Sequence, residues 1–285
     1  MRRWSVPVRG LDLGIYAGQQ GHQVLGDGLG VVAVAVVCPA AMRCANPHPS
    51  RPLASAMRRA TATRSIAGAD CPLRADSVAA PLRSGNGRLV VSGWTAWPYL
   101  PGRHEAGRWL EVVSAGRLLH AAFASLPRPA FLRARADWWA AGDRVAWGES
   151  PLEPYLDLDT VRDLAAALRP VQARPQLVHG DLTGNVLFHP TLPPAVIDLS
   201  PYWRPPAFAD AVVVADAMAW EGADAELPAL VAPGVPEFGQ CFLRALVYRI
   251  VTDRLAGGDR AHDWQAPYRP AVRIACTISA DSGDR

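Results

Sequence analysis

Residues 177–188, LVHGDLTGNVLF, and residues 195–200, AVIDLS, are the two segments that decide the fold. Each is a short apolar run interrupted by turn-forming residues, so the sequence predicts a strand, a loop and a strand, followed by a further strand that pairs with them. Both runs carry polar residues in this apolar setting: His179, Asp181, Asn185 and Asp198. They are either turn residues that end the strands, or carboxylate and amide groups directed at a metal ion and a phosphate.

The composition limits the class of protein. Of the 285 residues 50% are apolar, enough to bury a sizeable core in one large domain or two small ones. The net charge of +3 is too small to indicate nucleic-acid binding, and no apolar run approaches the roughly 18 residues of a membrane helix. The five cysteines are odd in number and lack a CxxC pair, which argues against a disulfide framework and against a zinc site. We therefore expect a cytoplasmic protein with neither nucleic acid nor membrane as a partner.

The chain changes character near residue 75. Residues 39–75 are rich in proline, alanine, arginine and serine and lack periodicity, which indicates loop or poorly ordered chain. The apolar run at 29–42 is expected to form a buried strand. A turn at 84–87, SGNG, is predicted to be of type I′ because Asn-Gly tolerates positive φ. It leads into a strand at 88–94, after which TAWPYLPG (95–102) leaves that strand and turns.

Downstream, the apolar spacing predicts helices. They span residues 105–126, 159–168 with Asp159 as N-cap, 210–220, and 238–255 ending at Gly257. The polar tail from Ala275 is predicted to be frayed. The fold class is therefore α+β, a two-lobed protein with an abnormal or degenerate N-lobe and a mostly helical C-lobe. Its predicted divisions are residues 1–75, 76–102 (a remnant N-lobe hairpin and hinge), 103–274 and 275–285.

The polar residues of the two opening segments suit phosphoryl transfer. This reaction needs a carboxylate that accepts or orients the proton of the attacking hydroxyl, and oxygen ligands that hold magnesium against the phosphates. Magnesium prefers hard oxygen donors, which aspartate and asparagine supply. Asp181 and Asn185 lie on one short loop, and Asp198 ends the strand expected to pair with it, so all three are predicted to reach one ion.

HGDLTGN followed by VIDLS resembles the catalytic loop and metal-binding strand of aminoglycoside phosphotransferases and the related choline and homoserine kinases, which share the protein-kinase-like fold. The likeness covers roughly residues 75–255 and extends through VIDLSPYWRP to an actinobacterial branch. It implies ATP and magnesium as cofactors, Asp181 as catalytic base, His179 as a hydrogen-bonding brace of the loop, and Asn185 and Asp198 as magnesium ligands. WPYLPG resembles the family hinge, which implies adenine contacts at Trp97 and Tyr99.

The sequence departs from the family in two places. The aspartate and asparagine of the loop are usually five residues apart in the family, whereas Asp181 and Asn185 are four apart. Kinase-like N-lobes also hold the phosphates with a strand lysine that a helix glutamate supports. All 29 basic residues here are arginine and the first glutamate is Glu105, so this pair cannot form.

A glycine-rich segment at 25–30 is a candidate phosphate loop, since Gly26, Gly28 and Gly30 precede an apolar strand; an ordinary turn is the alternative. Cys38 or Arg43 falls about where the lysine would lie. Three explanations stay open: a pseudokinase, a kinase with an arginine substitute, and an out-of-frame translation of residues 1–75 fused to an intact C-lobe, which the abrupt change in composition favours.

Other polar and aromatic residues are expected to be structural. Trp138, Trp139 and Trp147 are assigned to the core or to a lobe interface, and Asp210 and Asp216 to capping and bracing. The predicted function is ATP- and magnesium-dependent phosphotransfer to a hydroxyl of a small molecule. The alternative is a binding or scaffolding pseudokinase, and a metal-dependent hydrolase is more remote because this loop offers few histidine or carboxylate ligands.

Overall fold

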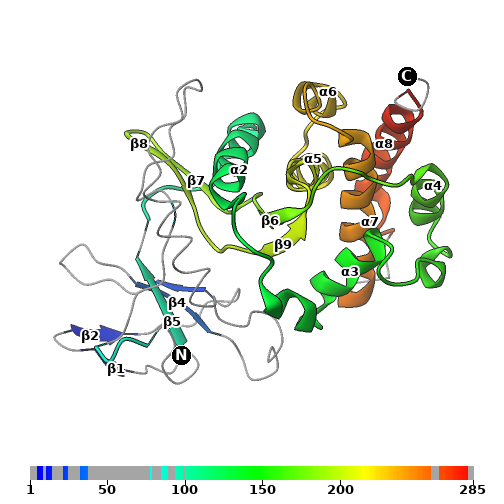
Figure 1. Cartoon of the computed structure of the whole chain (residues 1–285). Helices are drawn as coiled ribbons and strands as arrows, with labels where there is room; N and C mark the ends of the chain where they lie inside the picture. Colours follow the sequence, from blue (N-terminus) through cyan, green and yellow to red (C-terminus); the bar gives the residue numbers. More distant parts are fainter. Residues whose placement is uncertain are drawn as a thin grey trace. The chain divides into compact units, whose positions relative to one another are not determined.

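The computed structural model describes residues 78, 85–88, 94–98, 100–257 and 263–281, together with four strands near the N-terminus (Figure 1). The chain divides into two compact units. Unit 1 comprises Met1–Arg103 and Leu187–Asp198, and unit 2 comprises His104–Val186 and Leu199–Arg285. In the described residues no helix is long and apolar enough to cross a membrane.

Unit 1 is built from short antiparallel strands. β1 (Ser5–Val8) pairs with β2 (Leu11–Gly14), while β3 (His22–Val24), β4 (Ala33–Val37) and β5 (Trp94–Pro98) form a sheet in that order. β4 confirms the strand predicted within residues 29–42. β7 (Val186–His189) pairs with β8 (Leu192–Val196), which confirms the predicted pairing of the two opening segments.

Close backbone contact joins the chain after β5 to β7 within unit 1. Arg103 N donates to Phe188 O at 3.0 Å, and Phe188 N donates to Arg103 O at 2.8 Å. Gly102 makes this approach possible, because a Cβ there would lie 2.8 Å from Phe188 O, and its φ of +131° suits glycine alone.

Unit 2 is mostly helical, as predicted. Its helices are α2 (Trp109–Phe123), α3 (Trp138–Ala146), α4 (Asp159–Ala167), α5 (Pro206–Trp220), α6 (Leu227–Val231), α7 (Phe238–Ala256) and α8 (Arg269–Asp281). Short 3-10 turns lie at Ala130–Ala134, Glu153–Tyr155 and Ala266–Tyr268. One two-stranded sheet completes the unit, in which β6 (Gln176–His179) pairs with β9 (Pro201–Arg204).

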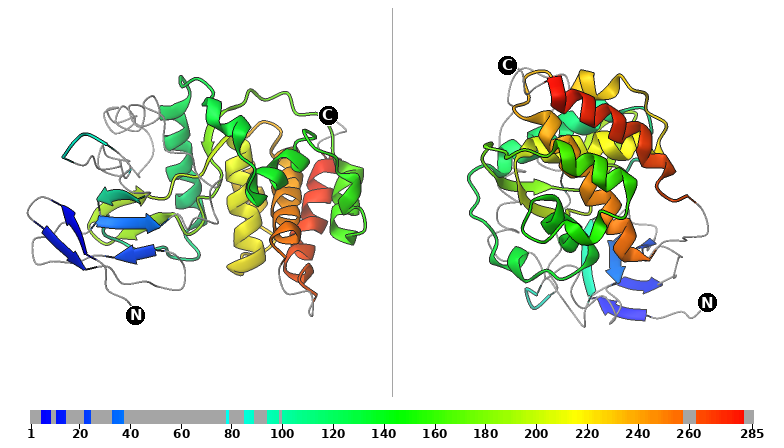
Figure 2. Two further views of the ribbon diagram at one scale, coloured as in Figure 1. Left: turned by 90° about the horizontal axis from the view of Figure 1, so that it is seen from below. Right: turned by 90° about the vertical axis from the view of Figure 1, so that its right-hand side faces the viewer.

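The core of unit 2 forms around α5 and α7, which are apolar around most of their circumference and are buried accordingly. α7 lies between α5 and α8 and also packs against α3 (Figure 2). α7 ends at Gly257, whose φ of +74° is the left-handed C-cap expected there.

Several predicted boundaries and assignments are wrong. Asp159 is the first helical residue and Leu158 the N-cap, so the carboxylate supports the helix N-terminus from inside the first turn. Residues 94–98 form β5 rather than a connector that leaves its strand. The turn at 85–87 is not of type I′, because Gly87 has positive φ and Asn86 does not.

The first part of the tail that was expected to be frayed continues α8, which runs to Asp281 and in which Ala275 is buried; residues 282–285 lie outside the described residues. Trp138 and Trp139 are 53% and 42% exposed rather than in the core. Both aspartates assigned to capping lie within α5 instead of at its start. Asp210 pairs at 2.8 Å with Arg117 of α2.

Candidate active site

The loop that carries the predicted catalytic residues is fixed where it leaves β6. Gly180 N donates to Ser200 O at 2.9 Å, which continues the pairing of β6 with β9. Gly180 also lies directly against the ring of Tyr202, since a Cβ at this position would lie 2.4 Å from Tyr202 Cδ2. These contacts set the direction of the chain one residue before Asp181.

Two buried histidines, His179 and His120, support the backbone of the loop at Asp181. His179 Nδ1 accepts a hydrogen bond from Asp181 N at 3.2 Å, and His179 N donates to His120 Nε2 of α2 at 3.0 Å. The His179 ring therefore contacts the backbone of Asp181, as a bracing residue would.

His120 must stay neutral for this arrangement. Its Nε2 accepts the hydrogen bond, so the proton is on Nδ1, which is buried without a hydrogen-bond partner in the described part of the chain. Burial, assisted by the nearby His179, lowers the pKa of His120 to about 3. The imidazole is therefore uncharged throughout the neutral range.

This shift predicts a pH-dependent loss of stability. Between about pH 6.5 and pH 3 the unfolded chain binds a proton at His120 and the folded chain does not, so the free energy of unfolding falls as the pH falls. We expect the wild type to lose stability relative to His120→Gln by roughly 1.4 kcal/mol per pH unit across this window. Urea unfolding at a series of pH values measures the difference, and parallel curves for the two proteins would contradict it.

Although Asp181 and Asn185 are four rather than five residues apart, the loop still brings their side chains together. Asn185 Nδ2 donates to the backbone oxygen of Asp181 at 2.7 Å and lies 3.4 Å from Asp181 Oδ2. Gly184 makes the turn between them with a φ of +80°. Because the amide nitrogen takes this role, the amide oxygen of Asn185 accepts no hydrogen bond from the described residues and is free to bind a cation.

Asp198 lies in unit 1, two residues beyond the end of β8. It is exposed and has a φ of +46°, in the left-handed region that non-glycine residues seldom occupy. Aspartate tolerates this conformation better than most residues, and such backbone strain is concentrated at functional sites. The donors predicted for magnesium are thus carboxylate and amide oxygens, the chemistry that this ion prefers.

An arginine that was not among the predicted site residues holds the carboxylate of Asp181. Arg249 of α7 donates through Nη2 to Asp181 Oδ1 at 2.7 Å, and through Nε and Nη2 to Asp216 of α5 at 2.7 and 2.5 Å. Arg249 and Asp216 are buried, whereas the Asp181 side chain is 39% exposed. The arginine therefore fixes one oxygen of Asp181 from the interior, while the side chain as a whole stays partly exposed.

The pKa shifts of Asp216 and Arg249 follow from the sharing of the Arg249 guanidinium by the carboxylates of Asp181 and Asp216. Burial raises the pKa of Asp216 to about 6, against the opposing effect of Arg249, and the nearby Asp181 acts in the same direction as burial. The pKa of Arg249 is raised, because burial, which lowers it, is outweighed by Asp216, Tyr248 and Asp181. The arginine is therefore always charged.

The signal for Arg249 was present in the sequence. It stands in the run FLRALVYRIV, within a helix whose residues are mostly apolar and buried. A charge buried in such a helix needs a partner of opposite charge, but the sequence alone does not indicate which one.

The predicted nucleotide-binding residues are only partly described. Trp97 lies in β5, opposite Val34 of β4. Tyr99, Gly26, Gly28 and Gly30 lie outside the described residues, as do Cys38 and Arg43.

The sequence matches the model of one protein family, described as the phosphotransferase enzyme family, over residues 41–242. The match begins before residue 75, where the composition of the chain changes. Among curated proteins, none has a significantly similar sequence.

Solved structures of phosphotransferases have the same fold. Spectinomycin phosphotransferase APH(9)-Ia, in complex with ADP and spectinomycin, is 13% identical with a TM-score of 0.53, over 96% of this chain and 94% of that chain. An aminoglycoside phosphotransferase from Alicyclobacillus acidocaldarius is 15% identical with a TM-score of 0.53, over 95% and 91%. The predicted α+β, protein-kinase-like fold with a mostly helical C-lobe is thereby confirmed.

Proposed function

Because the chain belongs to the phosphotransferase enzyme family, we propose that it transfers the terminal phosphoryl group of ATP to a hydroxyl group of a small molecule. The observation that carries this proposal is the arrangement of Asp181, whose carboxylate is held by Arg249 and whose side chain is 39% exposed. A carboxylate fixed in this way is suited to accept the proton of an attacking hydroxyl.

In this proposal Asp181 orients the acceptor hydroxyl and takes its proton. The hydrogen bond from Asp181 N to His179 and the one from Asn185 to Asp181 O hold the backbone of the loop at Asp181. Asn185, through its free amide oxygen, and Asp198 would hold magnesium. When bound, magnesium neutralises charge on the phosphates.

The class of acceptor is the finer part of the proposal. The solved relatives include proteins crystallised with spectinomycin and with hygromycin B, and with ADP or an ATP analogue. Polyhydroxylated amino sugars and related amino alcohols are accordingly the first acceptors to test.

A second candidate function is nucleotide or ligand binding without transfer. It is favoured by the absence of lysine from the whole chain, because no strand lysine can hold the phosphates. Arginine differs from lysine in presenting a planar fork rather than a compact charge.

Calorimetric titration with ATP tests the nucleotide and metal assignments. We expect the wild type to bind ATP more tightly with magnesium than without it, and Asp198→Asn to lose most of this difference. Asparagine is the informative substitution because it removes the charge but still tolerates positive φ at this position. No binding of ATP by the wild type would sink the proposed function, and an unchanged magnesium dependence in Asp198→Asn would sink the role of Asp198.

A further inference from the structure

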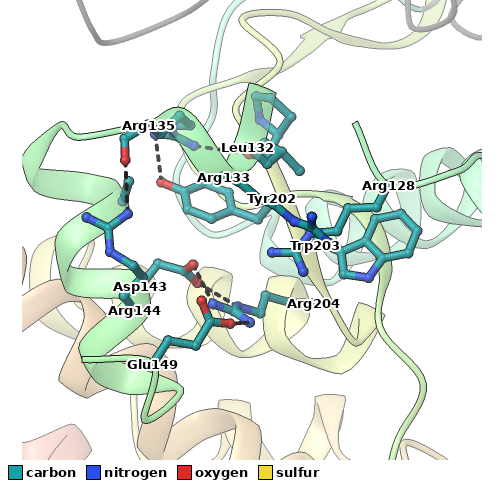
Figure 3. A pocket seen from close by; sticks show the side chains of 12 residues that line it. Arg128, Leu132, Arg133, Arg135, Asp143, Arg144, Glu149, Tyr202, Trp203 and Arg204 are labelled. Carbon is teal, nitrogen blue, oxygen red and sulfur yellow. Dashed lines mark hydrogen bonds and ion pairs between the residues drawn. The ribbon is translucent and has the colours of Figure 1, made fainter. Parts of the chain in front are cut away.

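Unit 2 contains a cavity of about 160 Å³ lined mainly by charged side chains (Figure 3). Its wall is formed by the segment before α3, by α3 itself and the turn after it, and by β9. A cavity of roughly 150 Å³ is large enough for a benzene-sized molecule. This one is therefore large enough for a small ligand and is charged rather than apolar.

The lining has an excess of positive charge. Five arginines face two acidic residues: Arg128, Arg133, Arg135, Arg144 and Arg204 against Asp143 and Glu149. Grouping like charges around one cavity is unfavourable unless counter-charges are present, and the acids of the lining are too few to provide them.

Two of the arginines are already engaged. Arg204 donates to both oxygens of Asp143, at 2.9 and 2.7 Å, and to Glu149 at 2.7 Å. Arg135 donates to both oxygens of Asp137, at 3.0 and 2.9 Å, and is buried. Both acidic residues of the lining, Asp143 and Glu149, are therefore already paired with Arg204.

The other three arginines keep donors available. Arg144 makes one hydrogen bond, to Arg135 O at 3.0 Å, and Arg128 acts on Glu149 only through its electric field. Arg133 is exposed at the rim and has no hydrogen-bond or ion-pair partner in the described part of the chain. The guanidinium fork of arginine matches the geometry of phosphate and carboxylate oxygens, and a phosphate carries about −1.5 to −2 charges at neutral pH.

We propose that this cavity binds a phosphate group, either inorganic phosphate or the phosphate of a small phosphomonoester, through Arg128, Arg133 and Arg144. A doubly charged phosphate offsets the surplus of positive charge better than a single carboxylate does. The apolar side chains of Leu132 and Trp203 line the same cavity and offer a surface for the body of a monoester. This site does not depend on the proposed phosphotransfer.

The cavity adjoins the catalytic loop through one side chain. Tyr202 lines the cavity, and its ring also lies against Gly180. Its hydroxyl is 2.9 Å from the hydroxyl of Tyr248, which precedes Arg249 in α7. A ligand bound in the cavity would therefore alter the packing next to Asp181.

Calorimetric titration at constant ionic strength tests the proposal, with inorganic phosphate and methyl phosphate as probes. Arg133→Gln and Arg128→Gln remove one exposed cation each without disturbing the buried pairs. We expect each to weaken binding by about tenfold or more, as the loss of a hydrogen bond to a charged group implies. Arg273→Gln is the matched control, because it removes an exposed arginine from α8, which does not line the cavity.

Each result of these titrations either supports or overturns the proposal. Tighter binding of inorganic phosphate supports free phosphate as the ligand, and tighter binding of methyl phosphate supports a monoester. The proposal is overturned if neither probe binds at millimolar concentration, or if Arg133→Gln and Arg128→Gln bind as tightly as the wild type, since phosphate then binds elsewhere. An equal loss in Arg273→Gln also overturns it, because the effect is then one of net charge.

Discussion

Replacing Arg249 by methionine is expected to lower the free energy of unfolding by about 3–5 kcal/mol, the usual cost of removing one partner from a buried ion pair. Methionine retains much of the length of the side chain and removes its charge. Asp216 would then be a buried carboxylate without its cation, and Asp181 would lose the hydrogen bond that fixes Oδ1. Urea unfolding followed by tryptophan fluorescence measures the loss.

Arg254→Met is the matched control for this substitution. Arg254 lies on the same helix and pairs with Asp157 at 3.4 Å, but both side chains are substantially exposed. Exposed ion pairs contribute roughly 0–1 kcal/mol to stability, so the control should change the free energy of unfolding very little. Equal losses for the two variants would contradict the role assigned to Arg249.

The double variant Arg249→Met with Asp216→Asn distinguishes two causes of the loss of stability. One is the loss of the contacts that Arg249 makes, and the other is the charge of Asp216 left buried without a cation. If the cost of Arg249→Met comes from the uncompensated carboxylate, the second substitution should restore a large part of the stability, because asparagine carries no charge. Additive losses would show that the cost lies in packing instead.

Replacing Asp181 by asparagine is the second large effect, and it falls on activity. Removing a general base typically lowers turnover by about 10²–10⁴-fold. We expect this loss in ATP-dependent phosphorylation of an accepted amino sugar or amino alcohol, measured as release of ADP. The substitution is close in shape, and Asp181 is partly exposed, so the midpoint of urea unfolding should change little.

Asp157→Asn is a suitable control, since it also replaces an exposed, arginine-paired aspartate of unit 2. It should leave turnover unchanged. An Asp181→Asn protein that keeps more than about a tenth of wild-type turnover would refute Asp181 as the base. Wild-type protein that binds ATP but phosphorylates no acceptor would favour the binding function instead.

Short sequence patterns predict much of the fold. The apolar runs of β6, β7 and β8 are short and end in turn residues, so their existence and the pairing of β7 with β8 follow from pattern alone. The long helix α7 is marked by its apolar content and by the glycine that ends it. Where a pattern was weak the prediction was wrong: α8 looks polar, and only its packing against α7 and α4 explains its order.

The exposed tryptophans show a different limit. The sequence assigns Trp138 and Trp139 to the core or to a lobe interface. They instead occupy the first turn of α3, with Trp139 lying 5.9 Å from the guanidinium of Arg249. Which side of a short helix faces the core depends on its neighbours.

The lineage of the fold is predictable from the sequence alone, because HGDLTGN and VIDLS concentrate the features of the family within a few adjacent positions. Only the tertiary structure revealed that Asp181 is held by Arg249 and Asp216, and that five arginines surround one cavity. Arg249 and Asp181 are 68 residues apart in the chain. Contacts between such distant residues arise from helix packing, which no local pattern encodes.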